Sequence, residues 1–502
     1  MATSILLKNG TLLLHDANDV VHASKDDLLI ENSQITKIAQ NIEPPSSDTT
    51  IIDCTDKIVS PGFIDTHHHV WQTCLKATHP NHTLFDYFPT GNFVSSFVSA
   101  DETFWGQLSG ALECIDSGTT TVVDHAHINI TPDHSKEAIR ATISSGIRSI
   151  FGYCPTARVT QWSPKFQMAP DPLAPWVMET FDQLAAMNPL GPSGRVRLGF
   201  AFDMLYLPGE ILKEIYGRVR RAGAQLITSH SVYGVAFGGP DAPSAANRLD
   251  SHGLLGPDIL LSHNTNPKPE HTQLIRDKGV KISSTPITEL QMGHGNPVCL
   301  YPEYQQISSL GIDCHSVCTS YIPTQMSTVL QWARARRHEE FEAHSKWAKN
   351  VGSSVRDVFN LGTIHGARCI NMENEIGSLA VGKKADIVIY DATSPGLLVA
   401  ADRDPIAAIV LHSSIRDIDT VIVDGVIRKE GGMLKDVLVA PDIETKEETG
   451  AQRVQWGEVA RRIRELGVLM DERKRAAVDD EIARAAILEA FHLNASAWAD
   501  TI

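Results

Sequence analysis

The stretch that decides the fold is Ser60-Pro61-Gly62-Phe63-Ile64-Asp65-Thr66-His67-His68-His69-Val70-Trp71-Gln72. Within it, an apolar run of strand length over residues 62–69 ends in three consecutive histidines. Side chains alternate between the two faces of a strand, so we expect Asp65, His67 and His69 to point one way and His68 the other. Two imidazoles at positions i and i+2 can bind the same cation. A His-x-His pair alone is weak evidence, because most buried histidines have a structural role.

Beyond this strand, the chain alternates apolar runs of strand length with helical stretches, a pattern typical of parallel α/β proteins. One predicted helix spans residues 208–222, with Ile211, Ile215 and Val219 on one face. The number of strand-like runs fits a closed (β/α)8 barrel, although a doubly wound sheet is compatible with the same count. The runs are residues 62–69, 119–126, 147–154, 196–203, 224–230, 258–264, 280–286 and 310–314.

Three of these runs end in a polar side chain after several apolar residues, namely His230, His263 and Asp313. The carboxyl ends of the strands of a β/α barrel converge at one mouth, where active sites are built. Burying these groups beside His67 and His69 without a cation would cost several kcal/mol in poorly paired polar atoms. The pattern therefore predicts a metal site, and its nitrogen and oxygen donors suit Zn²⁺ or Fe²⁺ better than Mg²⁺ or Ca²⁺.

The two ends of the chain carry short strands instead of β/α units. Residues 1–59 read as strands separated by turns such as Asn9-Gly10. Strand character returns at residues 385–390, 406–411 and 420–423, and Asp424-Gly425 is typical of a hairpin turn. We expect residues 1–59 and 372–438 to form one composite β domain, and residues 60–371 to form the metal-binding barrel.

Residues 439–502 have a different character, because apolar residues recur there at helical spacing among many charged ones. Val459, Ile463, Leu466 and Met470 lie on one helical face. We expect a helical tail that packs on the barrel or on a second subunit, with a solvated surface helix as the alternative.

The composition fits a large cytoplasmic enzyme. Lys and Arg number 44 against 60 Asp and Glu, a net charge of −16, so no basic surface predicts binding to nucleic acid or to an anionic membrane. The N-terminus lacks the pattern of a signal peptide, and no apolar run reaches the roughly 18 residues of a membrane helix. The eight cysteines are scattered and predict reduced thiols. The His-x-Glu and Pro-Cys-x-x-Cys motifs of one class of zinc deaminases do not occur.

The chain resembles the amidohydrolase superfamily, in the branch of cytosine, guanine and 8-oxoguanine deaminases and triazine hydrolases. The resemblance covers about residues 1–430, with the motifs in the family's order. It implies a distorted (β/α)8 TIM barrel with a β-sandwich domain formed from both chain ends, in agreement with the composite domain above. The matching stretches are residues 61–72, 117–125, 229–230, 261–263, 310–313 and 376–388.

Carried over position by position, the resemblance implies one divalent metal ion per chain, zinc or iron, held by His67, His69, His230 and Asp313. No lysine lies in residues 196–203 that could be carbamylated and bridge two metal ions, which favours a mononuclear site. The implied mechanism is attack by a metal-activated water, with Asp313 as the base. His263 would stabilise the developing oxyanion.

The resemblance also implies substrate contacts near the metal. Gln72 matches a glutamine that contacts a purine-like or triazine-like ring in relatives, although a loop glutamine facing water is the alternative. His125, His127 and His294 are further candidate pocket residues. The full set of expected substrate contacts is Trp71, Gln72, Tyr233, Asn266 and Glu289.

Three of these positions depart from the family pattern. Tyr233 stands where deaminases of this branch usually carry a proton-shuttling glutamate, and a phenol with a pKa near about 10 is a poor shuttle. Asn266 replaces a frequent histidine. Glu289 lies where relatives usually have Asn, and either supplies the missing carboxylate or is a solvated loop acid.

The leading functional hypothesis is a mononuclear metal-dependent hydrolase. It would cleave a C–N bond of amide, lactam, carbamate or amidine type in a small cyclic or heteroaromatic substrate, because one aspartate can both take and deliver the proton. The alternative is an aminohydrolase or dehalogenase that removes a substituent from a purine- or triazine-like ring. A metal-free scaffold protein is a third hypothesis, although no predicted ligand is lost. We also expect a homo-oligomer, either a dimer or a tetramer.

Overall fold

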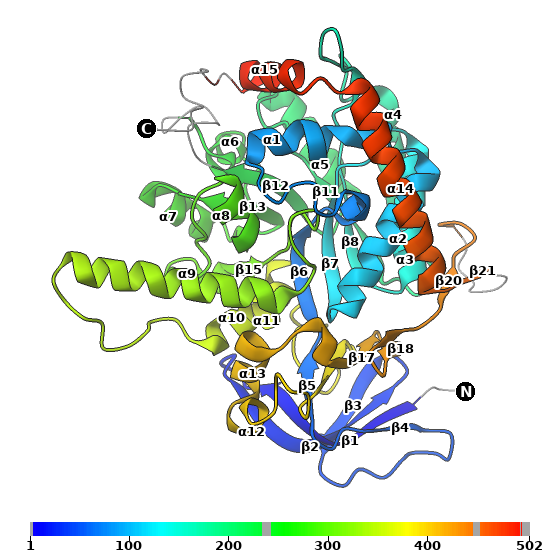
Figure 1. Cartoon of the computed structure of the whole chain (residues 1–502), viewed down its shortest axis with the longest axis vertical. Helices are drawn as coiled ribbons and strands as arrows, with labels where there is room; N and C mark the ends of the chain where they lie inside the picture. The colour runs from blue at the N-terminus through cyan, green and yellow to red at the C-terminus, as the bar shows by residue number, and fades with distance from the viewer. Residues whose placement is uncertain (1–3, 233–241, 445–451, 492, 494–502) are drawn as a thin grey trace.

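The computed structural model describes residues 4–232, 242–444, 452–491 and 493. A β/α barrel fills the upper part of the molecule in Figure 1, and a sheet built from both ends of the chain lies below it. None of the described helices is both long and apolar enough to cross a membrane. All eight cysteines are free.

The barrel contains eight parallel strands that pair side by side in chain order. It closes where the segment after the last strand meets the first: the backbone N–H of Asp313 donates to the carbonyl of His67 over 2.8 Å, and that of His69 donates to the carbonyl of Asp313 over 2.9 Å. The predicted α/β barrel class is therefore confirmed. The strands are β6 (Phe63–His68), β7 (Thr119–Ala126), β8 (Arg148–Tyr153), β11 (Val196–Ala201), β12 (Ile227–Val232), β13 (Ile259–Thr265), β14 (Lys281–Ser284) and β15 (Ser308–Leu310).

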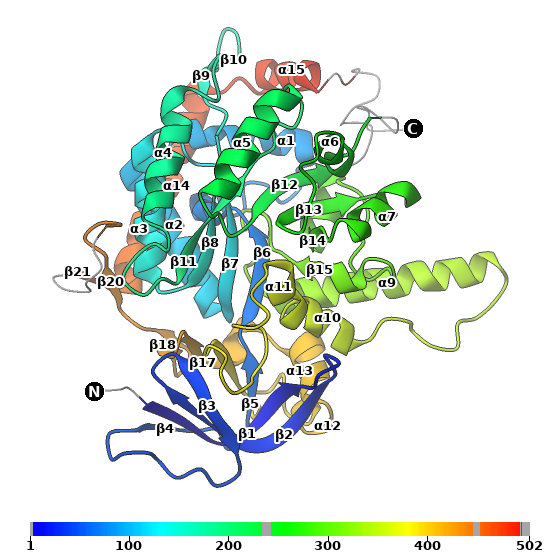
Figure 2. The same ribbon diagram turned by 180° about the vertical axis from the view of Figure 1, so that it is seen from behind.

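Helices cover the outside of the barrel, and the rear view shows α4 and α5 outside β8 and β11 (Figure 2). In α5 the buried face is Leu212, Ile215, Tyr216 and Val219, whereas Ile211 of the predicted face is exposed. The long helix α9 projects from the body (Figure 1). The helices are α2 (Ala100–Asp116), α3 (Pro132–Ser145), α4 (Pro175–Ala186), α5 (Gly209–Arg221), α6 (Ala245–Ser251), α7 (Pro269–Asp277), α8 (Pro286–Met292), α9 (Ile322–Ala343), α10 (Val355–Leu361) and α11 (Ile364–Cys369).

The second sheet has nine strands, and β5 joins the two chain ends in it. This strand pairs in parallel with β1 and antiparallel with β16, so residues from opposite ends of the sequence share one sheet. The composite β domain is thus present, and its residue boundaries stay a prediction. The strands are β1 (Ser4–His15), β2 (Val21–Glu31), β3 (Gln34–Ala39), β4 (Thr50–Asp53), β5 (Lys57–Pro61), β16 (Ile387–Asp391), β17 (Ile418–Val423), β18 (Val426–Glu430) and β19 (Met433–Leu434).

Two local predictions in this domain have opposite outcomes. Asp424 and Gly425 form the turn between β17 and β18 with φ of 53° and 76°, as a type I′ hairpin requires. The predicted strand at residues 406–411 is wrong, because these residues lie in helix α13 (Pro405–His412). A short apolar run does not distinguish strand from helix. Here Asp404 caps the N–H groups of Ile406 and Ala407, and proline occupies the first helical turn.

The described part of the C-terminal tail packs on its own barrel. Helix α14 (Trp456–Ala477) lies against α2 and against the short helix η1 (Val70–Leu75), with Val459, Leu466 and Met470 buried. Arg473 forms an ion pair with Glu102 of α2 over 2.8 Å. Helix α15 (Asp480–Ala490) lies over α1 (Leu84–Tyr87), as Figure 1 shows.

Candidate active site

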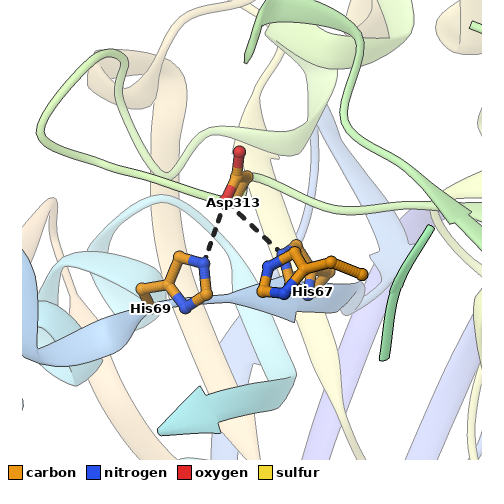
Figure 3. Close-up of side chains that lie close together, drawn as sticks. His67, His69 and Asp313 are labelled. Carbon is orange, nitrogen blue, oxygen red and sulfur yellow. Dashed lines mark ion pairs between the residues drawn. The ribbon is translucent and has the colours of Figure 1, made fainter. Parts of the chain in front are cut away.

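The four predicted metal ligands lie together at the carboxyl end of the barrel. Figure 3 shows His67 and His69 reaching from β6 toward Asp313. Oδ1 of Asp313 is 3.1 Å from Nε2 of His69 and 3.4 Å from Nε2 of His67. His230 joins them from β12, and one donor atom from each of the four residues lies within 4.8 Å of the others.

The alternation predicted for β6 fails at Asp65. Its carboxylate lies 2.7 Å from Nδ1 of His68 and also accepts the backbone N–H of Ile312 over 3.1 Å. Asp65 therefore pairs with His68 and does not lie with His67 and His69. The physical reason is an irregularity in the pairing of β6 with β7, where the register shifts between Asp65 and His68.

Hydrogen bonds to the other ring nitrogen orient the three histidines. Nδ1 of His69 donates to the carbonyl of His125 over 2.8 Å, and Nδ1 of His230 donates to Oδ2 of Asp203 over 3.0 Å. Nδ1 of His67 is hydrogen-bonded to Ser262 over 2.8 Å. This arrangement fixes the ring orientation of metal-binding histidines in other proteins and leaves Nε2 free for the ion.

The donor set passes a test for a divalent metal. Nε2 of His67 is buried and makes no hydrogen bond to any described residue, which is costly unless a ligand pairs with it. Burial holds the pKa of His67 well below its usual value, so its ring is neutral. Burial opposes ionisation of Asp313, but the nearby imidazoles of His67 and His69 outweigh it and hold the pKa of that carboxyl well below its usual range. Three imidazoles and one carboxylate suit zinc or iron.

Asp313 and His263 share an unusual backbone conformation. Their φ angles are 68° and 72°, in the left-handed region that residues other than glycine rarely adopt. Such strain costs about 1–3 kcal/mol per residue and is concentrated at functional sites. The two side chains converge, with one nitrogen of His263 within 4.8 Å of an Asp313 carboxylate oxygen.

The surroundings of His263 keep its ring neutral and fix its orientation. Burial lowers its pKa to about 3. Nδ1 is hydrogen-bonded to the hydroxyl of Thr285 over 2.9 Å and lies 3.7 Å from Oε1 of Glu289. The other nitrogen, Nε2, is therefore the one available to a substrate.

Glu289 is fully buried, so its interpretation as a solvated loop acid is wrong. Its Oε1 accepts the backbone N–H of Thr285 over 2.8 Å, and its Oε2 has no hydrogen-bond partner among the described residues. Burial raises the pKa of Glu289 well above its usual value. The carboxyl thus lies beside the Nδ1 edge of His263.

The other predicted substrate contacts occupy different environments. Gln72 is buried in η1, where its Nε2 donates to the hydroxyl of Tyr87 over 2.7 Å and its Oε1 is unpaired within the described structure. Trp71 is buried in the core and donates its indole N–H to His127 over 3.2 Å. Asn266 is exposed and lines a surface hollow together with Asn296, outside the ligand cluster. Tyr233 lies outside the described residues.

One residue of the site was missed by sequence reasoning. Asp203 follows β11, and its Oδ2 lies 3.0 Å from Nδ1 of His230 and 3.1 Å from Nε2 of His125. The pattern that indicated the ligands was available for it too, because Asp203 is the polar end of the predicted strand at residues 196–203.

Comparisons with known proteins agree with this geometry. The Amidohydrolase family model matches residues 58–201 and 228–428. The 5′-deoxyadenosine deaminase of Methanobrevibacter smithii is 23% identical over 433 residues, which cover 82% of this chain and 89% of that protein. The solved structure of a zinc-bound adenosine deaminase from Xanthomonas campestris has a TM-score of 0.71 at 16% identity, and covers 94% of this chain and 99% of that one.

A triazine hydrolase from Arthrobacter aurescens has a TM-score of 0.73 at 19% identity and covers 93% of this chain and 99% of that one. At these identities, the structural likenesses support the fold. The family match spans most of the sequence and includes the strands that carry the four ligands. The chain therefore belongs to the amidohydrolase family and is an enzyme that hydrolyses carbon–nitrogen bonds.

Proposed function

We propose that this enzyme uses one divalent metal ion, with zinc favoured over iron, to hydrolyse a C–N bond at an sp² carbon of a small cyclic or heteroaromatic molecule. The observation that carries the proposal is the convergence of four donor atoms, from His67, His69, His230 and Asp313, within 4.8 Å of one another. The absence of lysine from β11 favours a single ion. The cytoplasmic location and the homo-oligomer stay predictions from the sequence.

A bound ion at these four residues would polarise a water molecule and lower its pKa toward about 7. Asp313 is the carboxylate of the set, and its lowered pKa keeps it ionised before reaction. It takes a proton from the attacking water and delivers it to the leaving nitrogen.

His263 stabilises the oxygen that becomes negative during attack. We assign the proton of the neutral ring of His263 to Nε2, facing the reaction centre, with the hydroxyl of Thr285 donating to Nδ1. A buried N–H donor that is already oriented stabilises a developing oxyanion more than water would. The unpaired Oε1 of Gln72 is available to the polar edge of a ring.

Removal of an amino group from a purine-like ring is the second candidate. Its support is that proteins with 23–26% identity to this chain are named 5′-deoxyadenosine deaminase and 5-methylthioadenosine/S-adenosylhomocysteine deaminase. The buried Glu289, whose pKa burial raises well above its usual value, adds a carboxyl group close to the site. Dehalogenation of a triazine-like ring is a weaker alternative, suggested by the fold likeness to triazine hydrolase.

Metal analysis and a turnover screen test the proposal. Protein purified without chelators should hold about one ion per chain, and finding none would contradict the metal centre. The screen covers adenine nucleosides, pyrimidines, triazines, lactams and carbamates, with ammonia, chloride and ring opening measured separately. Asp313→Asn should abolish turnover, whereas Asp182→Asn, which removes a partner of Arg218 at the surface, should not. Ammonia release from a nucleoside would favour the second candidate.

A further inference from the structure

The candidate pocket residue His294 is buried, and its ring has no hydrogen-bond partner among the described residues. It follows α8, is 4% exposed, and neither Nδ1 nor Nε2 is hydrogen-bonded to any residue that the structure describes. An imidazole left unpaired in a protein interior loses the hydrogen bonds that it would make to water. Such a group in a native protein indicates a ligand that pairs with it.

The position of His294 is beside the reaction centre. Its ring meets that of His263 edge to face, with centroids 4.7 Å apart. One of its nitrogens lies within 4.8 Å of donor atoms of both His263 and Asp313. Its backbone is anchored as well, because its carbonyl accepts a hydrogen bond from the hydroxyl of Thr265 at the end of β13.

Charge decides between a second metal ion and a neutral ligand at this position. A first divalent ion already exceeds the single negative charge of Asp313. His263 and His294, the other two members of this donor group, are imidazoles and add no negative charge. The group of His263, His294 and Asp313 therefore offers a second buried dication no carboxylate beyond Asp313, which is unfavourable. A neutral imidazole instead offers one donor and one acceptor, which match a nitrogen-containing ring.

A second unpaired group lies close to the same loop. Oε1 of Gln72 is buried without a partner, while its Nε2 is held by Tyr87. Tyr87 packs in one apolar cluster with Met292, which is two positions before His294 in the sequence. Oε1 of Gln72 on η1 and the ring of His294 after α8 are thus two buried polar groups without a hydrogen-bond partner among the described residues.

We infer that His294 binds a ring nitrogen of the substrate, and that the substrate is a neutral, planar heterocycle that also presents a donor to Gln72. This inference rests on the proposed function and deepens it. The mononuclear site then has a metal side and a ring-binding side, with His263 between them. Burial lowers the pKa of His294 to about 3, so the ring stays neutral across the physiological range.

The test uses unsubstituted purine, which has the ring nitrogens but no group to be removed. Its Kd is measured by calorimetry on the metal-loaded enzyme, on His294→Phe and His294→Gln, and on His412→Phe as a control on the exposed end of α13. We expect His294→Phe to weaken binding at least about tenfold, the loss of roughly one hydrogen bond to a buried group. His294→Gln should restore part of the affinity, and the control should not change it.

The metal content of each variant separates the two roles of the histidine. We expect the same single ion in His294→Phe as in the wild type, whereas two ions in the wild type and one in the variant would overturn the inference in favour of a metal ligand. If the wild type fails to bind purine, or binds it as well without His294, the inference is wrong. If purine binding depends on His294 but no C–N bond is cleaved in the turnover screen, the inference stands and the proposed function fails.

Discussion

His67 and His68 are neighbours in the sequence and both are fully buried, yet their surroundings shift their pKa values in opposite directions. His67 shares the carboxylate of Asp313 with His69, and burial holds its pKa well below the usual value. His68 has Asp65 at 2.7 Å. Burial opposes its protonation too, but the charge of Asp65 outweighs this and raises its pKa well above the usual value.

The difference shows that the number of imidazoles per buried carboxylate decides whether a buried histidine can bind a metal ion. Around Asp313, where one carboxylate serves several imidazoles, burial keeps the ring of His67 neutral, and its free nitrogen can bind an external cation. Where one imidazole has a carboxylate to itself, the imidazolium is the cation and no metal is needed. The two outcomes lie on consecutive residues because the strand turns their side chains apart.

The largest effect should come from removing a donor on the metal side. We expect His67→Phe to lower kcat/KM at least about 10,000-fold, roughly 5.5 kcal/mol of transition-state stabilisation. Metal content should fall with it, because one of the four donors is lost. Plasma emission spectrometry and steady-state kinetics measure the two quantities. A variant that keeps its metal and turns over normally would exclude His67 as a ligand.

The equivalent substitution at His68, on the other side of the strand, should lower the stability of the protein. His68→Leu leaves the Asp65 carboxylate buried without its cation, so we expect the free energy of unfolding to fall by about 3–5 kcal/mol. The double variant with Asp65→Leu should recover a large part of that loss, as expected for a buried pair. Denaturant unfolding of the metal-loaded proteins measures both. If His68→Leu lost the metal without being destabilised, His68 would act in metal binding and not in stability, contrary to this comparison.

An intermediate effect is expected at the carboxylate that orients His230. Asp203→Asn keeps the shape of the side chain but makes it a weaker acceptor for the Nδ1–H of His230. Such changes typically lower metal affinity about 10- to 100-fold. Competition with a chromophoric chelator measures the Kd of zinc. Asp258→Asn, at a surface ion pair with Arg220, is the control and should leave the Kd unchanged.

The smallest effect is expected at Glu289, and it should depend on pH. Because the folded-state pKa is raised, the carboxyl ionises more easily in the unfolded chain. The protonated carboxyl therefore contributes to stability at a pH below the pKa of an exposed glutamate, about 4.3. This contribution is lost as the pH rises from there toward the pKa of Glu289 in the folded protein. Glu289→Gln should flatten this decline in Tm between acidic and neutral pH. A steeper decline in the variant would show that Glu289 is ionised in the folded protein.

Much of the barrel and its ligands could be predicted from polar residues that stand at the ends of apolar runs. The strand ends of a barrel converge, so these polar residues are brought together. His67, His69, His230 and Asp313 all carry that signal. The alternation rule failed at Asp65, since it assumes a regular strand and the pairing of β6 with β7 is irregular. The helix α13 was missed because its short apolar run is compatible with either a strand or a helix. The N-cap residue Asp404 is what favours the helix.

The burial of Glu289 could not be predicted from its own position. A glutamate is usually solvated, whereas Glu289 lies in α8 with its Oε1 3.7 Å from His263 of β13. Asp203 carried the same signal as the ligands but no motif. Its role depends on which histidine it faces, and that is set by the order of strands around the barrel.

The position of strand β5 in the sheet determines when the β domain can be completed during synthesis. One of its edges pairs with β1, within the first segment to be synthesised, but the other waits for β16, which follows the entire barrel in the sequence. Until then, Ile58 and Val59 lie on an open edge that other chains can extend. A nascent chain is therefore protected from association only after its barrel has emerged, and a chain cut at the end of the barrel would keep that edge open.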